Sequence, residues 1–258
     1  MKLNKLHDPE TGELKAIGFM SGSGTNLRKI LDYEHNIREK EGKSPYRVVA
    51  IFSDNFDSSA KEIGRDYNIP VIFRDIRAYY KACRLPRKDM SLRVEYDRET
   101  VKCLLPFEAK CAIFAGYMSI ASDVLINAFL GVNVHPADLS VTAFGKRRWV
   151  GDHAVRDAIL AGEKTISSTT HIVEPVVDGG RILMISSPLN IEMPHDINLS
   201  NPDHIKEIER INQNKLKEKG DWIILPKTIE YIAKGLYSVD ETGLLYFKEK
   251  PIPEGLKL

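Results

Sequence analysis

Short apolar runs alternate with stretches of helical spacing throughout the first half of this chain. Each run has the length of a buried strand, and the runs lie at Ala16–Met20, Val48–Phe52, Pro70–Phe73, Cys111–Ala115 and Gly131–Val134. Strands separated by helices pair in parallel, because the helix provides the crossover that a parallel pair needs. The pattern therefore predicts an α/β fold: a Rossmann-like, mostly parallel sheet flanked by helices. Ligands of such sheets bind at the carboxyl ends of the strands.

The pattern becomes looser after His135. We expect helices there at Asp152–Ala161, Pro202–Lys219 and Pro226–Gly235, and a hairpin around Glu241–Gly243. We interpret residues 1–135 as an N-terminal half that carries a phosphate loop, and residues 136–258 as a C-terminal half that completes a cleft. Together they form a single domain, from about residue 15 to residue 235.

Composition limits the classes of function. The chain has 258 residues, of which 43% are hydrophobic and 28% charged, as in an ordinary globular protein. Its net charge of +1 creates no field that attracts nucleic acid or an anionic membrane. Three cysteines without metal-type spacing favour a reducing compartment, and the N-terminus lacks the apolar run of a signal peptide. We expect a cytoplasmic protein with small-molecule substrates and with neither nucleic acid nor membrane as partner; the oligomeric state stays unknown.

A glycine-rich turn, Ser21-Gly-Ser-Gly-Thr-Asn26, follows the first apolar run and precedes a helical pattern. Glycines let a backbone approach a ligand closely, and the free N–H groups at a helix N-terminus favour an anion. The turn lacks the Gly-Lys-Ser/Thr of a P-loop, and Leu27 stands where a dinucleotide motif has its third glycine. It suits a phosphate monoester better than a dinucleotide. The alternative is a turn that only allows a sharp corner between strand and helix.

A cluster of cations lies between Asp75 and Arg93. It consists of Arg77, Lys81, Arg84, Arg87, Lys88 and Arg93. We interpret this stretch as a solvated insertion in preference to a phosphate-binding arm.

Three polar side chains stand where strands or turns end. Asn133 and His135 alternate along the last apolar run, so they face the same side, and Asp178 begins an Asp-Gly-Gly turn. An amide and a protonated imidazole can stabilise an oxyanion, and a carboxylate can move protons, so the set suits acyl transfer to an amine. Each residue also has an ordinary alternative: a surface histidine, a capping asparagine and a turn aspartate. His171 is expected to hold these three side chains in place without contacting the substrate.

Taken in order, these motifs resemble those of the folate-dependent formyltransferases, and most closely of the members that formylate glycinamide ribonucleotide. The resemblance extends from Lys15 to Ile191, with a weaker part to Gly235. It depends on Ser21-Gly-Ser-Gly-Thr-Asn-Leu27, Val49-Val-Ala-Ile-Phe-Ser53, Tyr96-Asp-Arg-Glu99, Ala115-Gly-Tyr-Met-Ser-Ile120, Asn133-Val-His-Pro136, Ala161-Gly162, Ser168-Thr-Thr-His171 and Val177-Asp-Gly-Gly180.

The resemblance implies an enzyme of purine biosynthesis. Such an enzyme transfers a formyl group from 10-formyltetrahydrofolate, its co-substrate, to the primary amine of a phosphorylated acceptor, glycinamide ribonucleotide. The catalytic residues that the resemblance implies are Asn133, His135 and Asp178. It places the acceptor phosphate at Gly24, Thr25 and Asn26, and the folate at Arg98, Met118, Ser119, Ile120 and Ala121. The candidate ligands have no metal-binding pattern, so no metal is expected.

Departures from the family pattern bear on the identity of the acceptor more than on the formyl-transfer reaction. Ser119 stands where the family usually has an arginine, and the segments Ala137–Ser140 and Phe144–Val150 are unusual. A late acidic residue of the family has its counterpart in Glu218 or Asp221. Three other functions stay open: formyl transfer to an aminosugar nucleotide or methionyl-tRNA, hydrolysis of formyltetrahydrofolate, and ligand sensing without catalysis.

Overall fold

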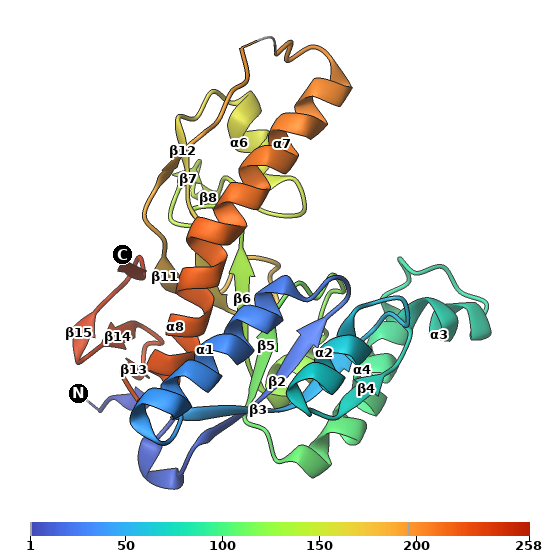
Figure 1. The fold of residues 1–258 in the computed structure, drawn as a ribbon, viewed down its shortest axis with the longest axis vertical. Coiled ribbons are helices and arrows are strands. Elements are labelled where there is room, and N and C mark those ends of the chain that lie inside the picture. Colours follow the sequence, from blue (N-terminus) through green and yellow to red (C-terminus); the bar gives the residue numbers. More distant parts are fainter. Residues whose placement is uncertain (1, 196) are drawn as a thin grey trace.

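One eight-stranded sheet runs through the molecule (Figure 1). The computed structural model describes residues 2–195 and 197–258. In spatial order the strands are β16 (Leu256–Lys257), β11 (Ile182–Ile185), β10 (Thr169–Ile172), β6 (Leu130–His135), β5 (Cys111–Phe114), β2 (Leu14–Met20), β3 (Tyr46–Ser53) and β4 (Val71–Phe73). The neighbours from β4 to β6 are parallel, whereas β10 is antiparallel to β6 and to β11. The predicted mostly parallel sheet is therefore confirmed, and both halves of the chain contribute strands to it.

Helices cover both faces of this sheet, which is why its central strands are continuously apolar. One face carries α1 (Thr25–Glu41), α2 (Ala60–Tyr67) and α8 (Trp222–Ala233), and the other carries α3 (Ile76–Ala82), α4 (Ser91–Leu104) and α5 (Asp123–Ala128). Ile30, Ile63 and Ile229 belong to the core of the first face. Tyr96 and Leu125 belong to the core of the second.

A smaller layer, which we call the upper lobe, stands beyond the carboxyl ends of the parallel strands (Figure 1). It consists of α6 (Ala154–Leu160), α7 (Pro202–Leu216), the hairpin of β7 (Thr142–Ala143) and β8 (Lys146–Arg147), and the pair β9 (Thr165–Ile166) and β12 (Leu189–Asn190). Trp149, Ala158, Ile208 and Leu216 pack together in its core. The lobe thus closes over the edge of the sheet where ligands of parallel sheets bind.

The expected break between Lys219 and Pro226 is wrong. A π-helical turn, Lys217–Asp221, joins α7 directly to α8, which already begins at Trp222. Pro226 lies inside α8, where a proline removes one backbone hydrogen bond. A π turn is the usual way in which a helix accommodates an irregular hydrogen-bond pattern, often at a functional site. Here it places Asp221 at the carboxyl edge of the sheet.

A second, four-stranded sheet lies beside both chain ends (Figure 1). It contains β1 (Asn4–Lys5), β13 (Tyr237–Val239), β14 (Leu245–Phe247) and β15 (Lys250–Pro251). The expected hairpin around Glu241–Gly243 is confirmed as β13 and β14. Two short 3-10 helices, η1 (Pro9–Thr11) and η2 (Leu105–Phe107), complete the described elements. Within the ranges 2–195 and 197–258, no helix has both the length and the apolar character that a membrane crossing requires.

The interpretation of Asp75–Arg93 as a solvated insertion is only partly correct. Asp75 caps α3 by accepting a hydrogen bond from the Ala78 N–H at 2.7 Å, and the side chains of Ile76 and Tyr80 are buried. Five of the six cations in the predicted cluster are exposed: Arg77, Lys81, Arg84, Arg87 and Lys88. The sixth, Arg93, is instead buried against the rings of Tyr80 and Tyr96. We call residues 76–90 the basic arm, because it contains five cations and a single acid, Asp89.

Candidate active site

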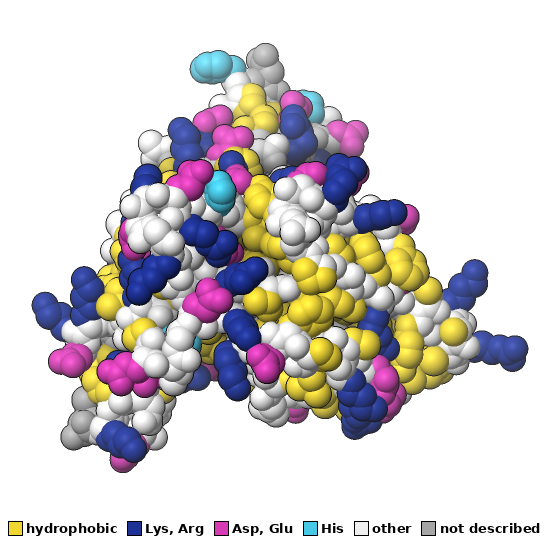
Figure 2. All heavy atoms as spheres, turned by 60° about the horizontal axis from the view of Figure 1, so that its bottom comes forward, with side chains coloured by type: hydrophobic (Ala, Val, Ile, Leu, Met, Phe, Trp, Pro, Cys, Tyr) yellow, Lys and Arg dark blue, Asp and Glu magenta, His cyan; other side chains and the backbone are white. Residues whose placement is uncertain are grey.

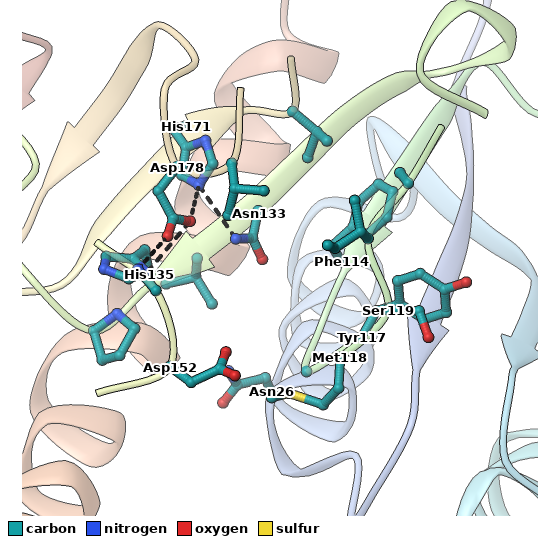
Figure 3. A pocket seen from close by; sticks show the side chains of 18 of the residues that line it. Asn26, Phe114, Tyr117, Met118, Ser119, Asn133, His135, Asp152, His171 and Asp178 are labelled. Atoms are coloured by element: carbon teal, nitrogen blue, oxygen red, sulfur yellow. Dashed lines mark hydrogen bonds and ion pairs between the residues drawn. The ribbon is translucent and has the colours of Figure 1, made fainter. Parts of the chain in front are cut away.

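A cavity of about 380 Å³ lies between the carboxyl ends of β5 and β6 and the upper lobe. In Figure 3, Asn133, His135, His171 and Asp178 form one side of the cavity, and Phe114, Tyr117, Met118 and Ser119 form the other. The structure therefore brings the three predicted catalytic residues together with most of the predicted folate contacts.

Strand pairing explains how three of these side chains meet. Asn133 and His135 are two residues apart on β6, so both project to the same face of the strand. His171 lies directly opposite Asn133 on the antiparallel β10. Directly opposed side chains of an antiparallel pair are close enough to interact. His171 therefore lines the cavity itself, beside Asn133 and His135, although it was expected only to hold them in place.

The hydrogen bonds of His171 fix the orientation of the Asn133 amide. The Nδ1 atom of His171 lies 2.9 Å from the Ile172 carbonyl, which only accepts, so Nδ1 carries a proton. While the ring is neutral, Nε2 is an acceptor, and the Asn133 amide nitrogen donates to it at 3.2 Å. When the ring gains a proton, Nε2 becomes a donor toward Asp178 Oδ1, 3.6 Å away. The second N–H of this amide is left for a ligand in the cavity. This arrangement holds Asn133 as a hydrogen-bond donor.

The turn around Asp178 is built for a carboxylate that points inward. Asp178 has a positive φ of 52°, which an aspartate tolerates better than most residues, and an Arg147 N–H donates to its carbonyl. The Gly151 N–H donates to the carboxylate at 2.8 Å. A Cβ on Gly180 would stand 1.8 Å from the Ile172 carbonyl oxygen, so only glycine lets the turn approach β10 this closely.

The Asp178 carboxylate lies between two imidazoles. Its Oδ1 atom is 3.4 Å from Nδ1 of His135 and 3.6 Å from Nε2 of His171. Burial acts to raise the pKa of Asp178, but the His171 ring, the charge of His135 and the Gly151 N–H outweigh it and hold this pKa at about 2. Asp178 is therefore ionised at neutral pH.

The pKa of His135 is lowered, even though the neighbouring Asp178 carboxylate acts to raise it. Burial lowers the pKa of this imidazole below its ordinary value, although the charge of Asp178 and the Trp149 carbonyl both act to raise it. The ring Nε2 lies 2.9 Å from the Trp149 carbonyl, so Nε2 keeps a proton, and Nδ1 is the atom that gains or loses one beside Asp178. His135 and Asp178 together form a proton acceptor at the edge of the cavity.

The opposite wall is the predicted folate wall, Met118–Ala121, and all four of its residues line the cavity. Met118 and Ile120 are exposed to 64% and 51%, so their apolar side chains are open to a flat ligand. Ser119 instead is buried, and its hydroxyl donates to Asp54. Arg98 lies elsewhere: it is on the surface of α4, forms an ion pair with Glu95, and does not line the cavity.

The predicted phosphate residues surround the start of α1. Gly24 adopts a left-handed φ of 66° immediately before the helix, and no side chain caps the first N–H groups. A Cβ on Gly24 would lie 2.4 Å from Ile63 and 2.8 Å from Met20, so the glycine is also required by core packing. Of the three predicted residues, Asn26 lines the cavity, whereas Gly24 and Thr25 do not.

The sequence left open whether Glu218 or Asp221 is the late acidic residue of the site. Asp221 lines the cavity, and Glu218 does not. It accepts hydrogen bonds from the Ser168 hydroxyl at 2.5 Å and from the Asn26 amide at 3.2 Å. Burial raises the pKa of Asp221 to about 6, because these neutral donors compensate only part of the lost hydration. Asp152 also lines this end of the cavity and lies near Asn26 in Figure 3. In residues 2–195 and 197–258, no three His, Cys, Asp or Glu side chains come together as a metal site would need.

The cavity thus combines an amide donor, a histidine–carboxylate pair and an apolar wall, and Asn26 of α1 lines it as well. The sequence profile of the formyl transferase family matches residues 14–210, and this chain belongs to that family. The matched region contains all of the site except Gln213, Lys217 and Asp221.

Individual relatives share this assignment and most of their length with the chain. It is 26% identical to a phosphoribosylglycinamide formyltransferase of Haemophilus influenzae over 91% of the chain and 94% of that protein. It is 29% identical to the Mycobacterium tuberculosis protein of the same name over 69% of the chain and 72% of that protein. The fold is similar to that of glycinamide ribonucleotide transformylase 1 from Symbiobacterium toebii, with a TM-score of 0.66 and 24% identity over 91% of this chain and 94% of that one.

Proposed function

We propose that this chain transfers the formyl group of 10-formyltetrahydrofolate to the primary amine of glycinamide ribonucleotide. The observation that carries the proposal is the cluster of Asn133, His135 and Asp178 on one wall of a single cavity, opposite an apolar wall. The family of the chain supports the formyl transfer, and the names of its relatives support the acceptor.

The amine nitrogen attacks the formyl carbon, and the formyl oxygen gains negative charge. The free N–H of the Asn133 amide donates to this oxygen, because the other N–H is held by His171. A donor that is oriented before the reaction needs no reorganisation as charge develops.

The amine must also lose a proton while the bond to N10 of the folate breaks. The Nδ1 atom of His135 takes up this proton, and the ionised Asp178, 3.4 Å away, stabilises the imidazolium that results. The same proton is then given to N10 of the departing tetrahydrofolate. Formyl transfer in this scheme leaves the protein in its starting protonation state, as a catalytic cycle requires.

The acceptor occupies the end of the cavity beside α1. Its phosphate is bound by the free N–H groups at the helix start after Gly24, where Thr25 and Asn26 begin the helix. Asp221 lies beside Asn26 and accepts hydrogen bonds from the acceptor when it is ionised. The folate lies along Met118–Ala121, whose exposed methionine and isoleucine side chains suit an aromatic ring system.

The test is a turnover assay with 10-formyltetrahydrofolate and a panel of amines, with a no-amine control. The panel contains glycinamide ribonucleotide, its dephosphorylated form and an aminosugar nucleotide. We expect turnover with glycinamide ribonucleotide, a much higher KM without the phosphate, and competition of inorganic phosphate with the amine but not with the folate. Equal rates with and without an amine would identify a hydrolase and contradict the proposal.

A further inference from the structure

The folate wall, Met118–Ala121, lies in a segment without helix or strand that connects β5 to α5. No N–H or C=O group of residues 117–121 forms a backbone–backbone hydrogen bond with another described residue. Such a segment depends on side chains for the partners of its backbone groups, and hence for its shape. The wall nevertheless has to hold the folate at a constant distance from Asn133, because the formyl group must reach the amide.

Asp54 holds the first half of the wall. It follows β3, is exposed to only 2%, and accepts hydrogen bonds from the Ser119 hydroxyl and, at 2.6 Å, from the Ser21 hydroxyl. The Ser21 oxygen in turn accepts the Met118 N–H at 2.9 Å. Arg87 of the basic arm also donates to the Ser119 hydroxyl, at 3.2 Å. One buried carboxylate thereby fixes a side chain and, through Ser21, a backbone N–H of the wall.

Asp97 holds the other end of the segment. It lies on α4, is fully buried, and its Oδ2 atom accepts the N–H of Ser122, the residue that follows the wall and precedes α5, at 2.7 Å. Its second oxygen, Oδ1, has no hydrogen-bond partner among the described residues. Burial raises the pKa of Asp97, although the Ser122 N–H and the charge of Arg93 act to lower it. A carboxylate buried in this way contributes little to stability, but it fixes the backbone at Ser122.

Acids on the surface have a different setting. On the face in Figure 2, Asp and Glu side chains lie scattered among lysines and arginines, and an ion pair such as that of Glu108 with Lys15 is open to water. Exposed pairs of this kind contribute little and hold their side chains loosely. Asp54 and Asp97 are instead surrounded by packed protein, so their oxygens keep a fixed position for the wall segment.

We propose that Asp54 and Asp97 are positioning residues for the co-substrate: they hold the folate wall in the shape that binds the folate and places its formyl group beside Asn133. This inference rests on the proposed function for the identity of the co-substrate. Both residues act through the wall, because neither lines the cavity. Without either carboxylate the wall samples other shapes, so that folate binding has to select the competent one and becomes weaker.

The test compares alanine and asparagine variants at both positions. Asp54→Ala and Asp97→Ala remove the hydrogen-bond acceptor, whereas Asp54→Asn and Asp97→Asn keep an oxygen that accepts. Glu34→Ala is the matched control, because Glu34 is also a buried helix carboxylate that accepts a backbone N–H, that of Val48 at 3.1 Å, but does not line the cavity or contact its walls. Hydrogen exchange of residues 116–123 is measured without ligands, and the Kd of 10-formyltetrahydrofolate is measured by titration calorimetry without acceptor.

We expect the two alanine variants to exchange hydrogen in residues 116–123 about tenfold faster and to bind the folate about tenfold more weakly, as the loss of one hydrogen bond to a charged group allows. At saturating folate their kcat should also fall. The asparagine variants should stay close to the wild type. Glu34→Ala should lower the thermal unfolding midpoint without changing the folate Kd. An unchanged folate Kd in the alanine variants, an equal rise in Glu34→Ala, or no recovery in the asparagine variants would overturn the inference.

A further variant, Ser122→Pro, covers the case in which Asp97→Ala does not fold. Proline removes only the N–H that Asp97 accepts, and the φ of −83° at Ser122 suits it. The folate Kd should rise as in Asp97→Ala, and an unchanged Kd would contradict the role of Asp97. Turnover with glycinamide ribonucleotide is measured separately. A wild type that binds the folate but formylates no amine contradicts the proposed function and leaves the role of the two carboxylates standing, whereas a wild type that binds no folate contradicts both.

Discussion

Asp178 and Asp221 lie in the same cavity and are almost equally buried, at 8% and 7% exposure, but their pKa values move in opposite directions. Burial raises the pKa of either carboxyl group. Asp178 has two imidazoles and a backbone N–H as partners, which together hold its pKa at about 2. Asp221 has only a hydroxyl and an amide, and its pKa stays at about 6. The comparison shows that the imidazole partners of Asp178, together with the fuller desolvation of Asp221, separate the pKa values of the two carboxyl groups.

This difference assigns the two acids different tasks. A carboxylate that stays ionised throughout the physiological range can stabilise an imidazolium during each turnover. A carboxyl group with a pKa of about 6 can exchange its proton as a ligand enters or leaves. Pairs of acids whose surroundings separate their pKa values are typical of sites that perform acid–base chemistry near neutral pH.

The largest effect is expected for Asp178→Asn. The amide keeps an acceptor for the Gly151 N–H but loses the charge that stabilises the His135 imidazolium. We expect kcat to fall by about a thousandfold, with an unchanged folate Kd. The fold is kept, but the thermal unfolding midpoint falls at neutral pH, because a carboxylate whose pKa is lowered on folding stabilises the folded state. Turnover close to that of the wild type, with normal folate binding, would remove Asp178 from the mechanism.

A smaller loss is expected for Asn133→Ala. Removal of one oriented donor to an oxyanion typically lowers kcat by about a hundredfold. The acceptor KM should change little, because the bond forms chiefly in the transition state. Steady-state kinetics with both substrates varied provides the measurement. If only KM rose and kcat stayed constant, Asn133 would be a ground-state contact, and the oxyanion would need another donor.

The pH dependence of kcat tests the His135–Asp178 pair as a unit. The pair must lose a proton before it can accept one from the amine, so kcat falls toward low pH. Because burial lowers the pKa of His135 below 6.5, this acid limb lies below the ordinary range of a histidine. In His135→Asn the limb should disappear together with most of the activity. A rate and a pH profile equal to those of the wild type would make His135 a structural residue only. The two groups titrate jointly, so the limb belongs to the pair.

For Asp221→Asn the expected effect is on stability and not on the rate. The pKa of Asp221 is raised on folding, so the folded state favours the protonated form. Its contribution to stability is complete below the unfolded pKa of about 4 and is lost as the pH rises through 6. The wild type should therefore lose up to about 3 kcal/mol relative to Asp221→Asn between pH 4 and pH 7. Urea unfolding of both proteins across this range measures the difference, and parallel curves would show that the Asp221 pKa is not raised.

The sequence predicts those parts of the fold and site that depend on local spacing. The alternation of apolar runs predicts the five parallel strands, because a buried strand and an amphipathic helix have different periods. The two-residue spacing of Asn133 and His135 predicts that they share a face, and both line the cavity. The Asp-Gly-Gly sequence predicts a turn at Asp178, and the structure has a turn there with a positive φ at Asp178.

The parts that could not be predicted depend on contacts between distant segments or on helix phase. Asp221 meets Asn26 across 195 residues, and nothing local distinguishes it from Glu218. Trp149 and Gly151 contribute a backbone carbonyl and a backbone N–H, which leave no signal in residue type. Arg98 stands on the exposed face of α4, whereas its neighbour Asp97 is buried, because successive helical residues point about 100° apart.

The contrast between Asp178 and Asp221 is tested most directly by a carbon-13 NMR titration of the aspartate side chains, with signals assigned through the Asp178→Asn and Asp221→Asn spectra. One carboxyl signal should titrate near pH 2 and be absent from Asp178→Asn. Another should titrate near pH 6 and be absent from Asp221→Asn. If both carboxyl groups titrate together in the ordinary range of an aspartate, the partners do not separate them, and the division of tasks in this cavity is contradicted.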